Sequence, residues 1–116
     1  MATEDADDKR AAARIHRRMI LRAAVFGDQP LRWSHVTIQN LSATGVFFMF
    51  DKVVHVGSLL HFKIDFPDRV IECMGRVRRI LGDPQAAFRG VGASFEGANP
   101  ADRDFIEEFV EKTKPR

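Results

Sequence analysis

Hydrophobic and polar residues alternate in short runs along most of the chain, which is the pattern of strands with one buried and one exposed face. The clearest run spans 58–66, in which apolar Leu60, Phe62, Ile64 and Phe66 alternate with polar His61, Lys63 and Asp65. Similar runs predict six strands, at 19–26, 33–41, 44–51, 58–66, 70–81 and 88–95. In the fifth run the alternation changes phase before Ile80, which indicates a β-bulge.

A helix is expected to close the chain. Asn99 is a favourable N-cap, Pro100 suits the first helical position and Asp102 lies in the first turn. The next apolar positions form a stripe at helical spacing, made by Phe105, Ile106, Phe109 and Val110. Six strands joined by short turns and followed by one helix predict a mainly β protein. We expect a six-stranded antiparallel β-barrel with a C-terminal α-helix and a flexible N-terminal arm.

The composition agrees with one small domain. A chain of 116 residues with 45% hydrophobic residues is long enough to bury a core. Cys73 is the only cysteine, which excludes an internal disulfide and fits a reducing compartment. No apolar stretch approaches the length of a membrane span, and no secretory signal opens the chain. We therefore expect a cytoplasmic protein without membrane insertion.

Charge is concentrated near the N-terminus, although the net charge is only +2. Residues 1–9 are polar and acidic and are expected to be disordered, whereas 10–22 is rich in arginine and contains no acid. A basic segment of this kind indicates contact with an anion, and the plainer interpretation is a solvated terminus without a function. We assign the basic arm to the folded domain, which then spans 10–116 and includes the C-terminal helix.

Residues typical of catalysis or metal binding do not cluster in the sequence. The four histidines are scattered without partners at metal-ligand spacing, at positions His16, His35, His55 and His61. Ser42 lacks a nucleophile-elbow pattern, and no glycine-rich phosphate loop precedes a helix. We therefore predict neither an enzyme nor a metal site, and no resident cofactor.

A polar turn separates the second and third expected strands. Asn40 offers one amide acceptor and two donors, Ser42 offers a hydroxyl, and Gly45 allows a ligand to approach the backbone. The plain interpretation is a surface turn that hydrogen-bonds to its own backbone. Arginine binds phosphate with its planar fork and donates well to guanine, so arm and turn together favour a guanine-containing phosphate ligand. Composition alone does not distinguish a nucleotide from RNA.

Residues 14–18 have the form Arg-x-x-x-Arg, and residues 40–45 have the form Asp/Asn-x-Ser-x-x-Gly. Two such motifs in this order, on either side of a first strand, resemble the PilZ domain, the bacterial receptor for cyclic di-GMP. Residues 57–62 and 90–95 also resemble strands of that family, so the similarity covers about 10–112. The region 10–116 is therefore expected to be a PilZ-like domain, preceded by the acidic segment 1–9.

The resemblance implies a role for each matching residue. Arg14 and Arg18 would wrap over cyclic di-GMP, Asn40 and Ser42 would bind a guanine edge, and Gly45 would keep the turn geometry. Asn40 stands where many members carry Asp, which removes a charged acceptor. Ala13 stands where a further arginine is frequent, so either Arg17 substitutes for it or the stacking is weaker.

The resemblance implies a receptor or adaptor that changes its surface on binding cyclic di-GMP and so regulates a downstream protein. One alternative is a nucleic-acid-binding barrel, but the chain has no Tyr and one Trp for stacking, so we expect no nucleic-acid partner. Another is a degenerate PilZ protein that acts through protein contacts alone. Phe47 and Met49 are expected to point outward, either as a patch for a partner or homodimer or beneath the C-terminal helix.

Overall fold

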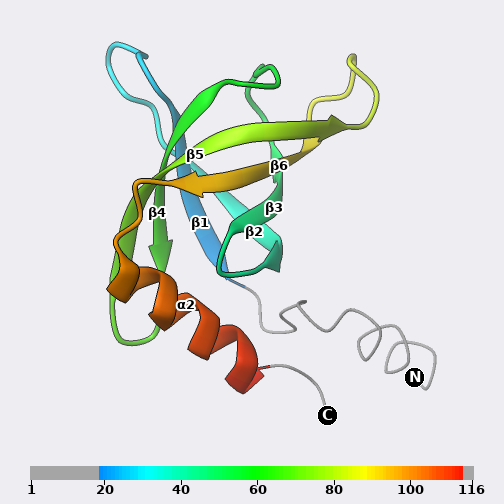
Figure 1. Cartoon of the computed structure of the whole chain (residues 1–116). Helices are drawn as coiled ribbons and strands as arrows, with labels where there is room; N and C mark the ends of the chain where they lie inside the picture. Colours follow the sequence, from blue (N-terminus) through cyan, green and yellow to red (C-terminus); the bar gives the residue numbers. More distant parts are fainter. Residues whose placement is uncertain (1–18, 114–116) are drawn as a thin grey trace, which may run out of the picture.

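The computed structural model describes residues 19–113 and has the predicted fold (Figure 1). Its elements are β1 (Ile20–Val25), β2 (Ser34–Leu41), β3 (Gly45–Phe50), β4 (Leu59–Asp65), β5 (Val70–Leu81), β6 (Arg89–Glu96) and α2 (Pro100–Thr113). Each strand begins and ends within one residue of its predicted boundary. The acidic segment 1–9 and the arm residues 10–18 lie outside the described residues.

The six strands form one closed barrel in which all neighbours are antiparallel, in the order β1-β2-β3-β6-β5-β4. The loops 26–33, 51–58 and 82–88 lie at one end of this barrel, at the top of Figure 1, which we call the loop end. The turns 42–44 and 66–69, the start of β1 and helix α2 lie at the other end, the helix end. Closure leaves no free strand edge among the described strands.

The barrel interior is filled by the inward residues of the alternating runs. Leu60, Phe62 and Ile64 of β4 are at most 1% exposed, and the ring of Phe62 meets Phe48 edge-on at 5.7 Å between centroids. T-shaped pairs of this kind add to the stabilisation from burial. The predicted core face of β4 is therefore confirmed.

Helix α2 covers the helix end. Its N-cap is confirmed, because the Asp102 backbone N–H donates to Asn99 Oδ1 at 2.8 Å. Ile106 and Val110 are buried, and the partly buried rings of Phe105 and Phe109 pack against Phe66, with centroids 5.1 and 5.0 Å apart. Among the described residues, no helix is long and apolar enough to cross a membrane.

Two register shifts interrupt the barrel ladder. The shift in β5 lies between Val77 and Arg79, which confirms the bulge indicated by the change of phase before Ile80. A second shift, in β2 between Ile38 and Asn40, was not predicted. Bulges rotate the following side chains and often occur beside functional sites. Both of these bulges lie beside the pocket described next.

Candidate ligand-binding site

The turn between β2 and β3 is closed by its own hydrogen bonds. The Ser42 backbone N–H donates to the Gly45 carbonyl at 2.9 Å, and Ser42 Oγ accepts from the Thr44 N–H at 3.3 Å. The Thr44 carbonyl in turn accepts from the Phe95 N–H at 2.9 Å, which fixes the turn to β6. The plain interpretation of the turn is therefore correct for Ser42, whose hydroxyl nevertheless lines the pocket below.

Gly45 is required by packing between β3 and β6. A Cβ at this position would lie 2.4 Å from the carbonyl oxygen of Ala93, which is a clash with backbone. Glycine at a strand position commonly marks such a close approach of two backbones. Gly45 thus has a structural role in the turn that is independent of any ligand.

Asn40 is placed by the unpredicted bulge in β2. Ile38 pairs with Phe48 and Asn40 pairs with Phe47, so Gln39 is the extra residue. Asn40 is partly buried, and among residues 19–113 its side-chain amide has no hydrogen-bond partner. Its acceptor and its donors remain available to a bound molecule.

One open pocket of about 370 Å³ brings the predicted turn residues together with residues of β5 and β6. Its lining consists of Asn40, Leu41, Ser42, Thr44, Gly45, Val46, Phe47, Arg78, Arg79, Gly92, Ala93 and Ser94. The lining contains two arginines and no carboxylate, so the pocket favours an anion. Asn40, Ser42 and Gly45 therefore line one pocket, and their role in binding a ligand there stays a prediction.

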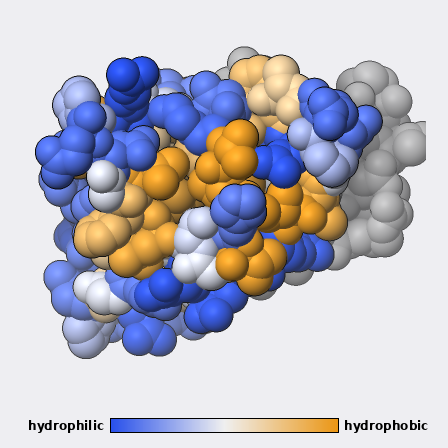
Figure 2. All heavy atoms as spheres, turned by 90° about the horizontal axis from the view of Figure 1, so that it is seen from above, coloured by the Kyte–Doolittle hydropathy of each residue, from blue (hydrophilic) through white to orange (hydrophobic). Residues whose placement is uncertain are grey.

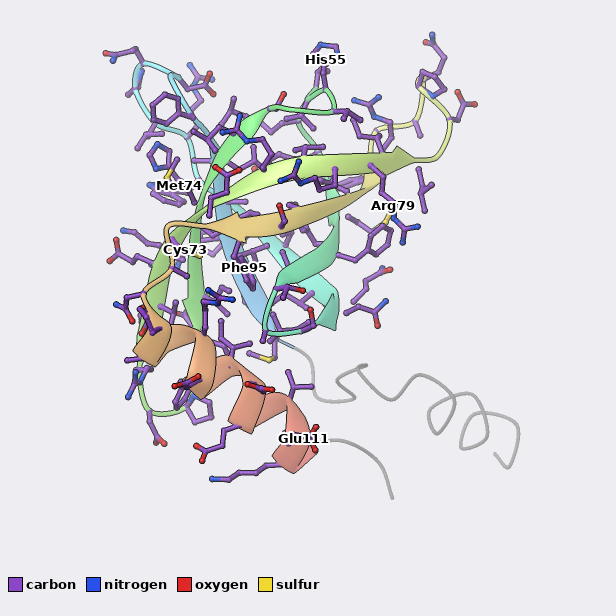
Figure 3. The ribbon with its side chains drawn as sticks, viewed as in Figure 1. His55, Cys73, Met74, Arg79, Phe95 and Glu111 are labelled. Carbon is purple, nitrogen blue, oxygen red and sulfur yellow. The ribbon has the colours of Figure 1, made fainter. Side chains whose placement is uncertain are left out.

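Arg78 and Arg79 were missed by the sequence reasoning. The bulge after Val77 places both consecutive arginines at the pocket. In an unbroken strand, one of the two side chains would point into the barrel. Arg78 Nε donates to Ser94 Oγ at 2.8 Å, whereas the guanidinium of Arg79, which is labelled in Figure 3, lies 5.5 Å from the ring centroid of Phe47. The change of phase before Ile80 was the available signal, but it was interpreted only as a bulge.

Phe47 and Met49 point outward as predicted, because Phe48 and Phe50 between and beside them are buried, but both are partly covered. Phe47 lies on β6, since a Cβ at Gly90 would be 2.5 Å from its ring. The residue that covers Phe47 is Arg79 of β5, whereas α2 packs on Phe66. Phe47 therefore belongs to the pocket and not to a helix interface.

A neighbouring ion pair influences the charge of the pocket. Arg76 binds Glu96 through two hydrogen bonds, Nε to Oε2 at 3.0 Å and Nη2 to Oε1 at 3.1 Å. This contact lowers the pKa of Glu96, and the charges of Arg76 and Arg78 lower it further. The closest Arg78 nitrogen is 3.9 Å from the same carboxylate. Because Arg76 makes the direct contacts, the positive charge of Arg78 is only partly compensated.

The predicted arm residues Arg14, Arg17 and Arg18 lie outside the described residues, but the point where the arm joins the barrel is defined. Met19 is buried, and its carbonyl accepts from the Ile38 N–H at 2.9 Å. The chain therefore enters the barrel beside β2, two residues before Asn40. Met19, the residue that follows Arg18, is therefore bound to the strand that carries Asn40 of the pocket.

The described residues offer no metal centre. In the range 19–113, no three His, Cys, Asp or Glu side chains are grouped so that they could hold a metal ion. Burial, with a smaller contribution from the charge of Asp102, raises the pKa of the Cys73 thiol to about 11. Cys73 is therefore a protonated, unreactive thiol at neutral pH.

Comparisons with solved structures show proteins of similar fold. The inhibitor of motility MotI/DgrA of Bacillus subtilis matches with a TM-score of 0.70 and 19% identity, over 86% of this chain and 48% of that one. MrkH of K. pneumonia matches with a TM-score of 0.70 and 14% identity, over 90% and 48%. The PilZ domain of YcgR from Escherichia coli, solved with c-di-GMP, matches with a TM-score of 0.62 and 9% identity, over 89% and 86%.

This chain spans about half the length of the MotI and MrkH chains that it matches. A search of the curated proteins finds no match. A family model described as PilZ domain matches residues 8–112, which is most of the chain and includes both motifs. The chain belongs to the PilZ domain family.

Proposed function

We propose that this PilZ domain binds cyclic di-GMP in the pocket beside the β2–β3 turn and acts as a receptor or adaptor for a downstream protein. The observation that carries the proposal is the convergence of Asn40, Ser42 and Gly45 with two arginines in one open pocket. The YcgR PilZ domain, whose fold this chain shares, was solved with c-di-GMP.

The chemistry of the pocket suits a guanine nucleotide. The free amide of Asn40 offers an acceptor for guanine N–H groups and donors for guanine O6 or N7. Arg78 and Arg79 offer charge-assisted hydrogen bonds to phosphate oxygens. The Arg79 guanidinium, which lies 5.5 Å from the ring centroid of Phe47, also offers a planar group on which a base can stack.

The arm completes the site in this proposal. Arg14, Arg17 and Arg18 precede Met19, which is fixed beside β2. An extended chain covers at most about 3.5 Å per residue, so the five residues 14–18 reach up to roughly 17 Å from Met19. They can close over a ligand in the pocket, and that closure would change the surface offered to a partner.

The pocket is proposed to bind and not to catalyse. Its lining has hydroxyl, amide and guanidinium groups but no carboxylate, histidine or cysteine that could act as a general base or nucleophile. Cyclic di-GMP is accordingly a ligand that is bound and released. No resident cofactor is required by this scheme.

Calorimetric titration of the full chain with cyclic di-GMP, GTP and a short RNA tests the proposal. We expect saturation by cyclic di-GMP alone. RNA binding that weakens steeply with salt would instead indicate the nucleic-acid-binding barrel. No binding to any of the three would indicate a PilZ protein that acts through protein contacts only.

A further inference from the structure

Exposed apolar side chains gather at the loop end of the barrel. Among the described residues, eight large apolar side chains are exposed, and six of them lie in or beside the three loops of this end: Phe26, Leu31, Val53, Val56, Leu81 and Phe88. We call these six residues the loop-end patch. Figure 2, seen from this end, shows an apolar band with hydrophilic residues on both sides. Apolar patches with polar borders on a small protein mark interaction sites.

The patch is presented by loops that are fixed to the barrel. Val54 is 3% exposed and anchors the 51–58 loop in the core, while its neighbours Val53 and Val56 are 77% and 66% exposed. Within this loop the His55 N–H donates to Ser58 Oγ at 2.9 Å, and His55 marks its tip in Figure 3. A surface that is already ordered loses little conformational entropy when it binds.

The 26–33 and 51–58 loops are also fixed to each other. Lys52 Nζ donates to the Arg32 carbonyl at 3.2 Å, and Ser34 Oγ donates to Asp51 at 2.9 Å. In the 82–88 loop, the Gln85 N–H donates to Asp83 Oδ1 at 2.9 Å. The 26–33 and 51–58 loops are therefore held against each other, and the 82–88 loop is closed by its own hydrogen bond.

The charges around the patch identify the kind of surface it fits. Each loop, with its flanking residue, carries one acid and one base: Asp28 with Arg32, Asp51 with Lys52, and Asp83 with Arg89. This balance differs from the excess of cations that nucleic acids and anionic membranes require. A surface that carries acidic and basic side chains next to each other can bind a second copy of itself, because each acidic side chain can lie opposite a basic one across a two-fold axis.

The exposed area also agrees with a second copy. The six residues are between 41% and 77% exposed, which together gives on the order of 500 Å² of mainly apolar surface. A standard interface buries about 800 Å² per partner, of which a little more than half is apolar. We propose that two copies of this chain associate through the loop-end patch, away from the β2–β3 turn and the helix end.

Sedimentation of the full chain over a range of concentrations tests this proposal. We expect the parent chain to form a dimer with a dissociation constant below about 0.5 mM. The double variant Val53→Asp with Val56→Asp places two charges in the centre of the interface, and we expect its dimer dissociation constant to rise at least about 100-fold. Phe88→Ser, in a different loop, should weaken the dimer in the same direction.

Val70→Asp is the matched control, because Val70 is 50% exposed but lies at the helix end. We expect it to dimerise like the parent, and circular dichroism should show that all variants are folded. A parent that stays monomeric, or a Val53/Val56 variant that dimerises as tightly as the parent, overturns the proposal. Cyclic di-GMP titration of the same variants separates this surface from the proposed ligand pocket, since binding should not change.

Discussion

Arg79 and Phe47 meet across strand β6 because the residue between them is Gly92. Phe47 of β3 pairs with Gly92 from one side, and Arg79 of β5 pairs with it from the other. A Cβ on Gly92 would lie 3.2 Å from Arg79 Cγ and 3.6 Å from Phe47 Cδ1. The missing side chain thus allows a guanidinium from one strand to cover an aromatic ring two strands away, inside the candidate pocket.

Replacing Arg79 with alanine tests whether this stack contacts the ligand. The change removes a positive charge and a stacking face, which are together worth about 1–2 kcal/mol, so Arg79→Ala should weaken cyclic di-GMP binding roughly tenfold. Calorimetry gives this ratio directly. Arg32→Ala removes an equal charge at the loop end and serves as the control, with unchanged affinity. Equal affinities for the Arg79 variant and the parent would remove Arg79 from the site.

Asn40 is expected to contact a guanine edge. Asn40→Ala removes both acceptor and donors and should reduce affinity by about 1–3 kcal/mol, whereas Asn40→Asp restores the charged acceptor found in many members and should bind at least as tightly as the parent. Competition of both variants for a labelled ligand ranks them against the parent. If the alanine variant binds like the parent, the amide does not contact the ligand.

Gly45 should matter for stability even without a ligand. Gly45→Ala places a Cβ against the Ala93 carbonyl, which cannot move without disturbing the β3–β6 ladder. Such crowding costs about 1–3 kcal/mol, measurable by urea denaturation of the ligand-free protein. Thr44→Ala, at an exposed position in the same turn, should change stability by less than about 0.5 kcal/mol. Equal unfolding midpoints for the two variants would contradict the packing role of Gly45.

Cys73 should resist alkylation at neutral and mildly alkaline pH. Burial raises the pKa of its thiol from 9.0 to about 11, so the reactive thiolate forms only as the pH rises toward that value. At pH 8 the thiolate fraction is about 100-fold below that of an unperturbed cysteine, and labelling by iodoacetamide should be slower in proportion. Unfolding in urea should restore the ordinary rate. If the folded protein is labelled as fast as the unfolded chain, the Cys73 thiol is not buried with a raised pKa.

Local pattern was sufficient to predict the strands. The alternation of Leu60, Phe62 and Ile64 reflects burial on one side of β4, and the cap at Asn99 reflects hydrogen bonding within four residues. Both depend on neighbours in sequence, so one sequence is enough to predict them.

The pocket depends on neighbours in space, which the sequence does not contain. Arg79 and Phe47 are 32 positions apart, and they meet only because β6 inserts between β3 and β5. The bulge before Asn40 likewise depends on pairing with β3, and its only trace in the sequence is the change of phase between Ile38 and Leu41, which the prediction of an unbroken strand passed over. The turn motif therefore predicted half of the pocket wall, and the barrel order was needed for the other half.

The most direct test of the account compares cyclic di-GMP binding by the parent, Arg18→Ala and Arg10→Ala in one calorimetric series. Arg18 belongs to the Arg-x-x-x-Arg motif and directly precedes the anchored Met19, whereas Arg10 lies in the same arm outside the motif. We expect Arg18→Ala to lose about 2–5 kcal/mol of binding free energy, and Arg10→Ala to bind nearly as the parent does. If Arg18→Ala binds as tightly as the parent, the arm does not close over the pocket and the proposed mechanism is wrong.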